Sequence, residues 1–457
     1  MKPPVRIKLT RFFLLLAVIL FPLSPAAQPL RVHPANPRYF MDETGKAVYL
    51  TGSHYWSNAP TTYQKWQHYW QYRAEYNFED YLNFMIANNQ NFTRLWALGV
   101  FHGPAGSEFP TPYLRTGPGL AHDGQSKFDL TRLDQRYYDL LRSMVQAAKD
   151  KGIYVDIMLF EGWWLHGRPN DHWPDHPYNP ANNINDLDLS LEQIHTLENS
   201  ALVAIQEQYI RKVVDTVNDL DNVLFEIANE DGLGSREWSY HWVNFIKNYE
   251  STKPYQHPVG MTYRYQEYGP DNIAEKNQEL FDSNADWVSP KEQSPTAETA
   301  DGRKVSILDT DHICPFQPDK NCGPGFIWQA FLHGHNPIIM DVAGTGNGSA
   351  GLEKFRRDSG HTRRFAERMD LVAMVPSDNL VTKGPGYCLA SDREYLVYLP
   401  NGGSVTIDLH NTEGTVSVEW FNPVNGESSS ASSVTGGVSQ EFTSPYSGES
   451  VLYLKKE

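Results

Sequence analysis

Between residues 48 and 342, short apolar runs alternate with longer stretches whose apolar positions recur at helical spacing. Buried parallel strands read as short apolar runs, and the helices that connect them show an apolar stripe of period about 3.6. The candidate strands are residues 48–53, 92–96, 153–160, 223–228, 258–262, 286–288, 305–308 and 337–340. Eight such strands joined by helices predict an α/β protein with a closed (β/α)8 TIM barrel. The fifth and sixth runs are short, so a doubly wound open sheet is the alternative.

Three helical stripes support this interpretation. The clearest one ends before Gly152, a helix-stopping residue that precedes the run starting at residue 153. The stripes comprise Tyr137, Leu140, Leu141, Met144, Val145 and Ala148; Phe78, Tyr81, Leu82 and Met85; and Leu202, Ile205, Tyr209 and Val213. We expect these aromatic and aliphatic side chains to pack in the core.

The pattern changes after residue 374. Residues 395–399, 404–409, 415–420 and 451–454 are short strand-like runs between Gly, Asn and Ser turns, with no helical stripe. This texture predicts a small antiparallel β-sandwich. The Ser- and Gly-rich residues 428–437 are interpreted as a surface loop of it. The expected domains are therefore a barrel at 29–374 and a sandwich at 375–457.

The first 28 residues have the pattern of a signal peptide: four cations, an apolar run over residues 12–23, and small residues at 24, 26 and 27. The apolar run is shorter than the roughly 20 residues that span a bilayer. We therefore expect export, to a secreted or periplasmic location, with no membrane span after cleavage. Removing the four cations and no acids takes the formal net charge from −16 to about −20, which disfavours nucleic-acid binding. We expect a monomer.

The cysteines are Cys314, Cys322 and Cys388, with no C-x-x-C pair. This excludes a disulfide-rich scaffold and a cysteine zinc site. Cys314 and Cys322 are candidates for a disulfide that closes one loop. Cys388 lies in a strand-like segment and is expected to be a buried small hydrophobe.

In a barrel, functional residues follow the carboxyl ends of the strands. His54 and Trp56 follow the first run, Trp96 ends the second, and Trp163 and Trp164 follow the third. Indole rings stack on sugar rings while polar neighbours bind hydroxyls. The tryptophans predict a carbohydrate cleft, although Trp96 or Trp163 taken singly is also compatible with a cap on the barrel core.

Carboxyl groups end the fourth and seventh runs. Asn229 and Glu230 stand where a buried run meets a glycine-containing turn, and Asp309 and Asp311 lie on one face of the seventh run. Glycoside hydrolysis needs one carboxylic acid that protonates the leaving oxygen and a second carboxylate that acts as nucleophile or base. Glu230 suits the first role. A turn or helix cap is the structural alternative for the aspartates.

This combination resembles the clan of retaining (β/α)8 glycosidases that includes cellulases, over about residues 30–342. The resemblance implies Glu230 as acid/base, Asn229 as the ligand of a sugar hydroxyl, and Arg94 as support for the charge of the nucleophile. It also implies Tyr263 and His312 as further cleft residues. The clan usually has Glu as nucleophile, whereas this chain has Asp. The clan's strand-seven pattern favours Asp311, with Asp309 as the alternative.

More narrowly, residues 309–312, 331–337 and the sandwich resemble a bacterial group whose C-terminal module is labelled collagen-binding. The sandwich sequence itself shows no feature that recognises collagen.

Three further motifs carry less weight. His166, His172 and His176 lie in a Pro-rich loop whose Pro174 breaks the helical spacing a metal site would use, so we expect no metal and no cofactor. The glycine-rich residues 346–351 follow the last barrel run instead of opening a βαβ unit, which disfavours nucleotide binding. Asn91 and Asn347 begin glycosylation sequons.

The sequence thus predicts an exported retaining glycoside hydrolase that acts on O-glycosidic bonds of a polysaccharide or oligosaccharide. A non-catalytic carbohydrate-binding protein on a barrel scaffold is the first alternative. An adhesin that works through residues 375–457 is the second.

Overall fold

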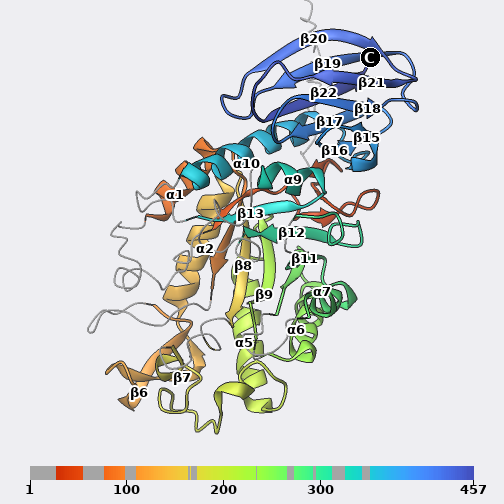
Figure 1. The fold of residues 1–457 in the computed structure, drawn as a ribbon. Coiled ribbons are helices and arrows are strands. Elements are labelled where there is room, and N and C mark those ends of the chain that lie inside the picture. The colour runs from red at the N-terminus through yellow and green to blue at the C-terminus, as the bar shows by residue number, and fades with distance from the viewer. Residues whose placement is uncertain are drawn as a thin grey trace, which may run out of the picture.

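The structure is a computed structural model that describes residues 27–54, 77–97, 110–162, 165, 172–232, 234–264, 272–291, 295–310, 325–341 and 350–457. A barrel of strands surrounded by helices forms one part, and an antiparallel β-sandwich stands beside it at the C-terminal end (Figure 1). Among the described residues, no helix is long and apolar enough to cross a membrane.

The barrel is closed and follows the strand order β10-β11-β12-β13-β4-β5-β8-β9. Every neighbouring pair is parallel. In chain order the strands are β4 Gly52–His54, β5 Phe92–Trp96, β8 Tyr154–Glu161, β9 Val223–Asn229, β10 Val259–Thr262, β11 Trp287–Ser289, β12 Val305–Asp309 and β13 Asn336–Met340. The TIM-barrel expectation is confirmed, and the open sheet is excluded because β13 pairs with β4.

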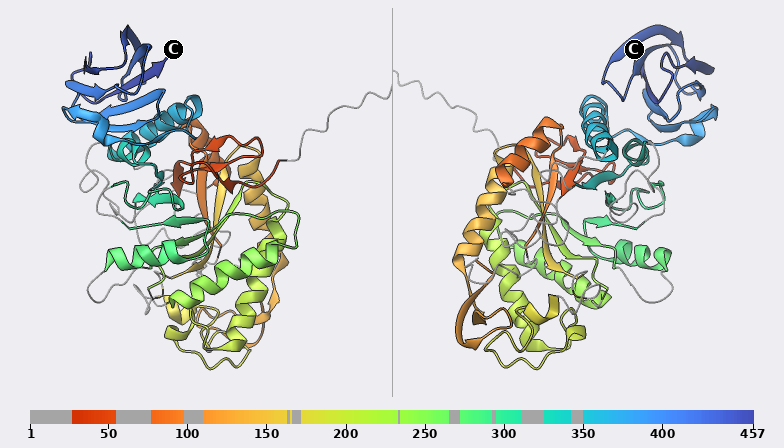
Figure 2. Two further views of the ribbon diagram at one scale, coloured as in Figure 1. Left: turned by 90° about the vertical axis from the view of Figure 1, so that its right-hand side faces the viewer. Right: turned by 60° about the vertical axis from the view of Figure 1, so that its left-hand side comes forward.

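Helices surround the barrel (Figure 2). They are α1 Phe78–Ala87, α2 Gln135–Lys149, α5 Ser200–Val217, α6 Arg236–Glu250, α7 Ile273–Asp282, α9 Phe326–Leu332 and α10 Ala350–Arg368, with short 3-10 turns at Trp173–Asp175, Leu191–Gln193 and Asp378–Leu380. The three expected stripes lie on α1, α2 and α5, and most of their side chains are buried, although Leu140 is 37% exposed. Gly152, with φ of 69°, ends the turn after α2.

The first barrel strand is shorter than expected. Residues 47–48 form β3 Ala47–Val48, which joins β1 Arg31–Val32 and β2 Phe40–Met41 in a separate antiparallel sheet. The backbone between β3 and β4 is bonded by side chains instead: Asn91 Oδ1 accepts from Thr51 N at 3.0 Å, and Asn336 Oδ1 accepts from Leu50 N at 2.9 Å. Side-chain amides thus replace the ladder bonds that a longer strand would make.

One hairpin was not anticipated. Strands β6 Tyr113–Leu120 and β7 Ser126–Leu133 pair with each other between β5 and α2. Much of the hairpin is exposed, so its sequence lacks a strong apolar alternation. Its buried Phe128 exchanges backbone bonds with the loop at Asn182 and Ile184, at 2.8 and 2.9 Å, which fixes the hairpin to the segment that follows β8.

The sandwich contains a six-stranded and a three-stranded sheet. The first consists of β14 Val375–Pro376, β16 Tyr387–Ala390, β17 Glu394–Leu399, β22 Ser450–Lys456, β19 Thr415–Phe421 and β20 Ser428–Thr435, and the second of β15 Val381–Lys383, β18 Ser404–Asp408 and β21 Ser439–Thr443. Cys388 is buried and free, as the buried-hydrophobe interpretation expects. The loop interpretation of residues 428–437 is wrong, because most of them form edge strand β20. Nearly all side chains of β20 are exposed, so no apolar period marked it.

The sandwich packs on the barrel through a shared apolar core. The ring of Trp328 on α9 stacks on Tyr398 of β17, with centroids 5.8 Å apart and an interplanar angle of 5°. The rings of Phe421 in β19 and Phe365 in α10 have centroids 5.3 Å apart. Ion pairs flank this core, including Arg368–Glu419 at 2.6 Å and Lys354–Glu449 at 2.7 Å. The barrel and the sandwich are therefore joined by a packed apolar interface that ion pairs flank.

Candidate active site

Ionisable side chains converge toward the carboxyl ends of the barrel strands. His54 ends β4, Arg94 lies in β5, Glu161 ends β8, Glu230 follows β9 and Asp309 ends β12. All five are buried, with exposed fractions of 9% or less. Such a group is costly to bury unless its charges are paired, so its partners are informative.

Arg94 lies at the centre of the cluster. Its Nη1 donates to Asp309 Oδ2 at 2.5 Å, and its Nε lies 2.8 Å from Glu226 Oε2 and 3.2 Å from Asp156 Oδ2. His54 Nε2 lies 3.2 Å from Asp309 Oδ1 and 3.1 Å from Asp309 Oδ2. Asp309 therefore has two donors, one of them permanently cationic.

The buried acids around Arg94 differ in their protonation. Burial would by itself lower the pKa of Arg94, but Glu226, Asp309 and Asp156 outweigh it and raise the pKa, so the guanidinium stays charged. Burial raises the pKa of Asp156, and it raises that of Glu226 well above the ordinary range. One guanidinium cannot balance three carboxylates, so at least one of the three carboxyls must be protonated. We assign this proton to Glu226, whose pKa is raised well above the ordinary range, even though its carboxyl lies within ion-pair distance of Arg94. Of the three carboxyls, Asp309 makes the shortest contact with Arg94.

Glu230 has a strongly raised pKa. Burial raises its pKa from 4.5 to about 8; Asp309 and Glu161 contribute in the same direction, while Lys291 and Arg94 oppose it. The group is therefore protonated at neutral pH and able to donate a proton. Its backbone φ of 37° is left-handed, a conformation that costs a non-glycine residue about 1–2 kcal/mol and that surrounding contacts must hold.

Asn229 contacts the carboxylate of Glu161, the last residue of β8. Asn229 Nδ2 donates to Glu161 Oε1 at 3.0 Å, and the two residues are register partners of β9 and β8. Glu161 thereby lies next to the Asn229–Glu230 pair. Lys291, which follows β11, was missed entirely; an isolated polar residue after a short strand gave no motif to recognise.

The aromatic candidates in the described part of the chain are buried. Trp96 at the end of β5 is 4% exposed, and Tyr263 after β10 is fully buried. The Tyr263 ring lies 5.3 Å from Lys291 Nζ and 5.6 Å from Lys276 Nζ. Tyr263 thus lies near Lys291, one of the charges that act on Glu230, whereas the burial of Trp96 is compatible with core packing.

Several expected residues fall outside the described ranges. These are Trp56, Trp163, Trp164, Asp311 and His312, together with Cys314, Cys322, His166 and Asn347. Within the described ranges, no group of three or more His, Cys, Asp or Glu side chains has the arrangement of a metal site.

The histidines of residues 331–337 belong to the scaffold. His335 Nδ1 lies 2.8 Å from Ser306 Oγ at the start of β12, and its Nε2 lies 2.6 Å from Thr296 O. His333 Nε2 lies 2.9 Å from Asp378 Oδ2 next to the sandwich. Since these contacts occur at the amino ends of β12 and β13, the motif supports the fold at the barrel end opposite to Glu230.

The closed (β/α)8 barrel is a fold that this chain shares with solved glycoside hydrolases. A structure of a glycoside hydrolase family 5 protein from Bacteroides vulgatus is 12% identical, covers 94% of this chain and 93% of its own, and has a TM-score of 0.59. Another from the same organism, described as a "putative glycoside hydrolase", is 14% identical over 94% of this chain and 82% of its own, with a TM-score of 0.61. At these identities the likeness establishes the fold.

Two family models match parts of the sequence. Residues 106–267 match "Domain of unknown function (DUF6298)", and residues 375–454 match "Putative collagen-binding domain of a collagenase". A comparison with curated proteins found no significant match. The second match supports the expected group resemblance of the sandwich.

Proposed function

We propose that this protein is a retaining glycoside hydrolase that cleaves O-glycosidic bonds of a polysaccharide or oligosaccharide. The observation that carries the proposal is a pair of carboxyls in different electrostatic environments at one end of the barrel. Burial raises the pKa of Glu230 to about 8, while Asp309 is held by Arg94 and His54. A protonated acid and an ionised carboxylate are the two groups that glycoside hydrolysis needs.

In this mechanism Glu230 protonates the leaving oxygen while the strand-seven carboxylate attacks the anomeric carbon. A glycosyl-enzyme ester forms as the glycosidic bond breaks. Glu230, now ionised, takes a proton from water, and the water hydrolyses the ester with release of the sugar. No cofactor takes part in these steps.

The nucleophile is proposed to be Asp309, with Asp311 as the alternative. The clan pattern favours Asp311, which lies outside the described residues. The contacts favour Asp309, because Arg94 and His54 stabilise its negative charge and because its charge contributes to the raised pKa of Glu230. The second effect requires Asp309 to be near the proposed acid.

The test is a substrate screen followed by three variants. Reducing-sugar release over mixed polysaccharides identifies a substrate for the wild type. Glu230→Gln should then abolish hydrolysis of poor leaving groups and partly spare activated aryl glycosides, which need little protonation. Asp309→Asn should be inactive on both. If Asp309→Asn retains more than about a tenth of the wild-type rate, an effect under about 1.4 kcal/mol, and Asp311→Asn does not, Asp311 is the nucleophile.

A non-catalytic carbohydrate-binding protein predicts a different result: sugar binding that survives Glu230→Gln, with no hydrolysis by the wild type. An adhesin predicts that residues 375–457 bind a matrix ligand without the barrel. Export is a separate proposal, motivated by residues 1–28. N-terminal sequencing of the mature protein tests it, with cleavage near residue 28 expected.

A further inference from the structure

Asp231 is a buried carboxylate next to Glu230 to which the proposed mechanism gives no role. It is 2% exposed, and a buried charge needs partners. Its Oδ1 accepts a hydrogen bond from His195 Nδ1 at 2.9 Å and one from the backbone N of Gly234 at 2.8 Å. These contacts fix the residue that directly follows Glu230, whose backbone is left-handed.

His195 is tied to the same segment a second time. Its backbone carbonyl accepts from Ser235 N at 3.0 Å, and its ring stacks on Trp238 with centroids 4.5 Å apart. Trp238 Nε1 donates to Gln206 Oε1 at 3.0 Å, and Gln206 Nε2 donates to Ile194 O at 2.8 Å. The residue before His195 is therefore fixed through α5 and α6, so His195 is a rigid donor.

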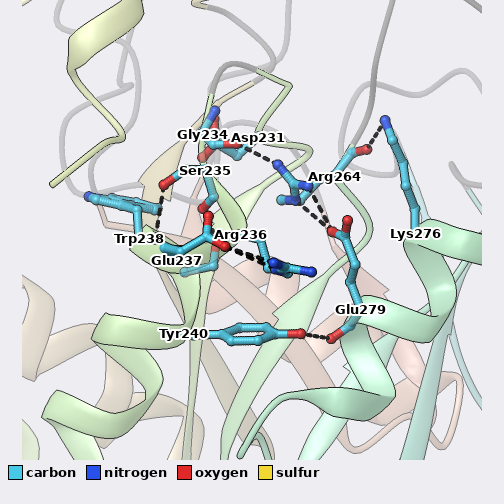
Figure 3. A network of polar contacts seen from close by, with 11 residues as sticks. Asp231, Gly234, Ser235, Arg236, Glu237, Trp238, Tyr240, Arg264, Lys276 and Glu279 are labelled. Carbon is cyan, nitrogen blue, oxygen red and sulfur yellow. Dashed lines mark hydrogen bonds and ion pairs between the residues drawn. The ribbon is translucent and has the colours of Figure 1, made fainter. Parts of the chain in front are cut away.

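Two glycines allow Asp231 to reach this position. A Cβ on Gly162 would lie 2.4 Å from Asp231 Cα, and a Cβ on Gly234 would lie 1.5 Å from Asp231 Oδ2. The far side of the turn is held by Arg264, whose Nη1 donates to Gly234 O at 2.5 Å and whose Nη2 pairs with Glu279 at 2.7 Å (Figure 3). The turn after Glu230 is thus enclosed from β8, from the His195 loop and from β10.

We propose that Asp231 and His195 are a positioning pair that holds the Glu230 carboxyl in line with the leaving oxygen of the substrate. Neither residue touches the reacting atoms. The inference rests on the proposed function, because it concerns the placement of Glu230 as an acid.

The experiment compares Asp231→Ala with Asp231→Asn on substrates of graded leaving-group ability. Asp231→Ala removes both hydrogen bonds. It should lower kcat on a poor leaving group by about tenfold to a hundredfold, the size of effect that a displacement of about 1 Å produces, while KM changes little. Activated aryl glycosides should lose much less, because they need little protonation. Asp231→Asn keeps an accepting oxygen and should retain most of the activity.

A second variant guards against a folding defect in Asp231→Ala. His195→Phe keeps an aromatic ring against Trp238 and removes the Nδ1 donor, so it should shift the leaving-group ratio in the same direction. In a Glu230→Gln background, Asp231→Ala should cause almost no further loss on an activated aryl glycoside, the substrate that Glu230→Gln still hydrolyses, since the two changes act through one group.

The matched control is a buried His–carboxylate pair outside the candidate active site, His257–Glu250. Its Nδ1–Oε1 distance is 2.7 Å and its side chains are 0% and 1% exposed, but it lies at the amino end of β10. Glu250→Ala should lower the melting temperature and leave the leaving-group ratio unchanged. A purely structural role for Asp231 predicts that Asp231→Ala behaves in the same way, and that result overturns the inference.

Different results would overturn the proposed function and the positioning role of Asp231. If the wild type hydrolyses no glycoside, the proposed function fails and the inference fails with it. If hydrolysis depends on Glu230 but Asp231→Ala lowers the rates on good and poor leaving groups equally, only the positioning role is overturned.

Discussion

At the scale of single residues, the protonation of the site depends on how many acidic and basic side chains lie near each carboxyl. Glu230 has Asp309 and Glu161 as acidic neighbours and Lys291 and Arg94 as basic ones. A general acid works only while it is protonated, so activity should be lost as the pH rises through about 8. Each neighbouring carboxylate that is removed should move this limit to lower pH.

Glu161→Gln tests that relation. The variant removes a negative charge near Glu230 and keeps an oxygen that can accept from Asn229 Nδ2. Because Glu161 helps to raise the pKa of Glu230, the basic limb of kcat/KM for a poor leaving group should shift to lower pH. The control is Asp139→Asn, which neutralises an exposed carboxylate on α2. A basic limb that stays in place or moves upward would contradict the assignment.

The raised pKa of Glu230 also leads to a prediction that can be tested without a substrate. Its pKa is about 8 in the folded protein against an ordinary value of 4.5, so between these values the folded state binds more protons than the unfolded state. Stability is therefore lost as the pH rises through this window. Glu230→Gln cannot ionise, and its melting temperature should exceed that of the wild type by more at pH 8 than at pH 5. An equal difference at both values would mean that the pKa is not raised.

At the scale of elements, side-chain amides shape the first barrel strand. Asn91 accepts from Thr51 N and donates to Tyr49 O, both at 3.0 Å, and it is 5% exposed. Gly52 allows β4 to approach β5, since a Cβ there would lie 1.9 Å from Phe92 O. The sequon that begins at Asn91 is therefore used for a structural bridge in the folded protein.

Asn91→Ala should destabilise the protein by about 2–4 kcal/mol, because it leaves a buried donor and a buried acceptor without their partners. Chemical denaturation measures this free energy of unfolding. Asn425→Ala, in an exposed turn of the sandwich, should change it by less than about 0.5 kcal/mol. Comparable stability of the two variants would show that the Asn91 bridge contributes nothing.

At the scale of the whole molecule, the barrel and the sandwich share one apolar core. Trp328, Phe331 and Phe365 of the barrel helices pack in the same cluster as Tyr398, Phe421 and Tyr453 of the sandwich. Without the sandwich, the apolar side chains of the barrel helices in this cluster would be exposed to water, which is unfavourable. The sandwich is therefore expected to stabilise the barrel, whatever it binds.

Truncation after residue 374 should consequently give an aggregating or strongly destabilised barrel. Tyr398→Ala is the point variant: it removes the stack on Trp328 and should cost about 3–5 kcal/mol, seen as a lower melting temperature. Val438→Ala, at a sandwich position that is 49% exposed, should have little effect. A truncated barrel with unchanged stability and activity, but without polymer binding, would favour the binding-module interpretation instead.

The sequence by itself determined the features that depend on local periodicity. Apolar runs placed the strands of the barrel, helical stripes placed α1, α2 and α5, and the position of Glu230 and Asp309 after such runs put both at one end of the barrel. These inferences work because strand and helix periods are local and because parallel strands of a closed barrel end on the same side.

Only the tertiary structure decided which groups meet. Arg94 contacts Asp309 across 215 positions of chain, and the closeness of Glu230 to Glu161 depends on the pairing of β8 with β9. Strand β20 has little apolar pattern because neighbouring backbone, and not burial of its own side chains, holds it in place. Strands β6 and β7 bury only a few of their side chains, which is too few for a clear pattern. The pKa of Glu230 likewise depends on burial and on charges from four separate strands or strand ends, and no window of sequence contains that sum.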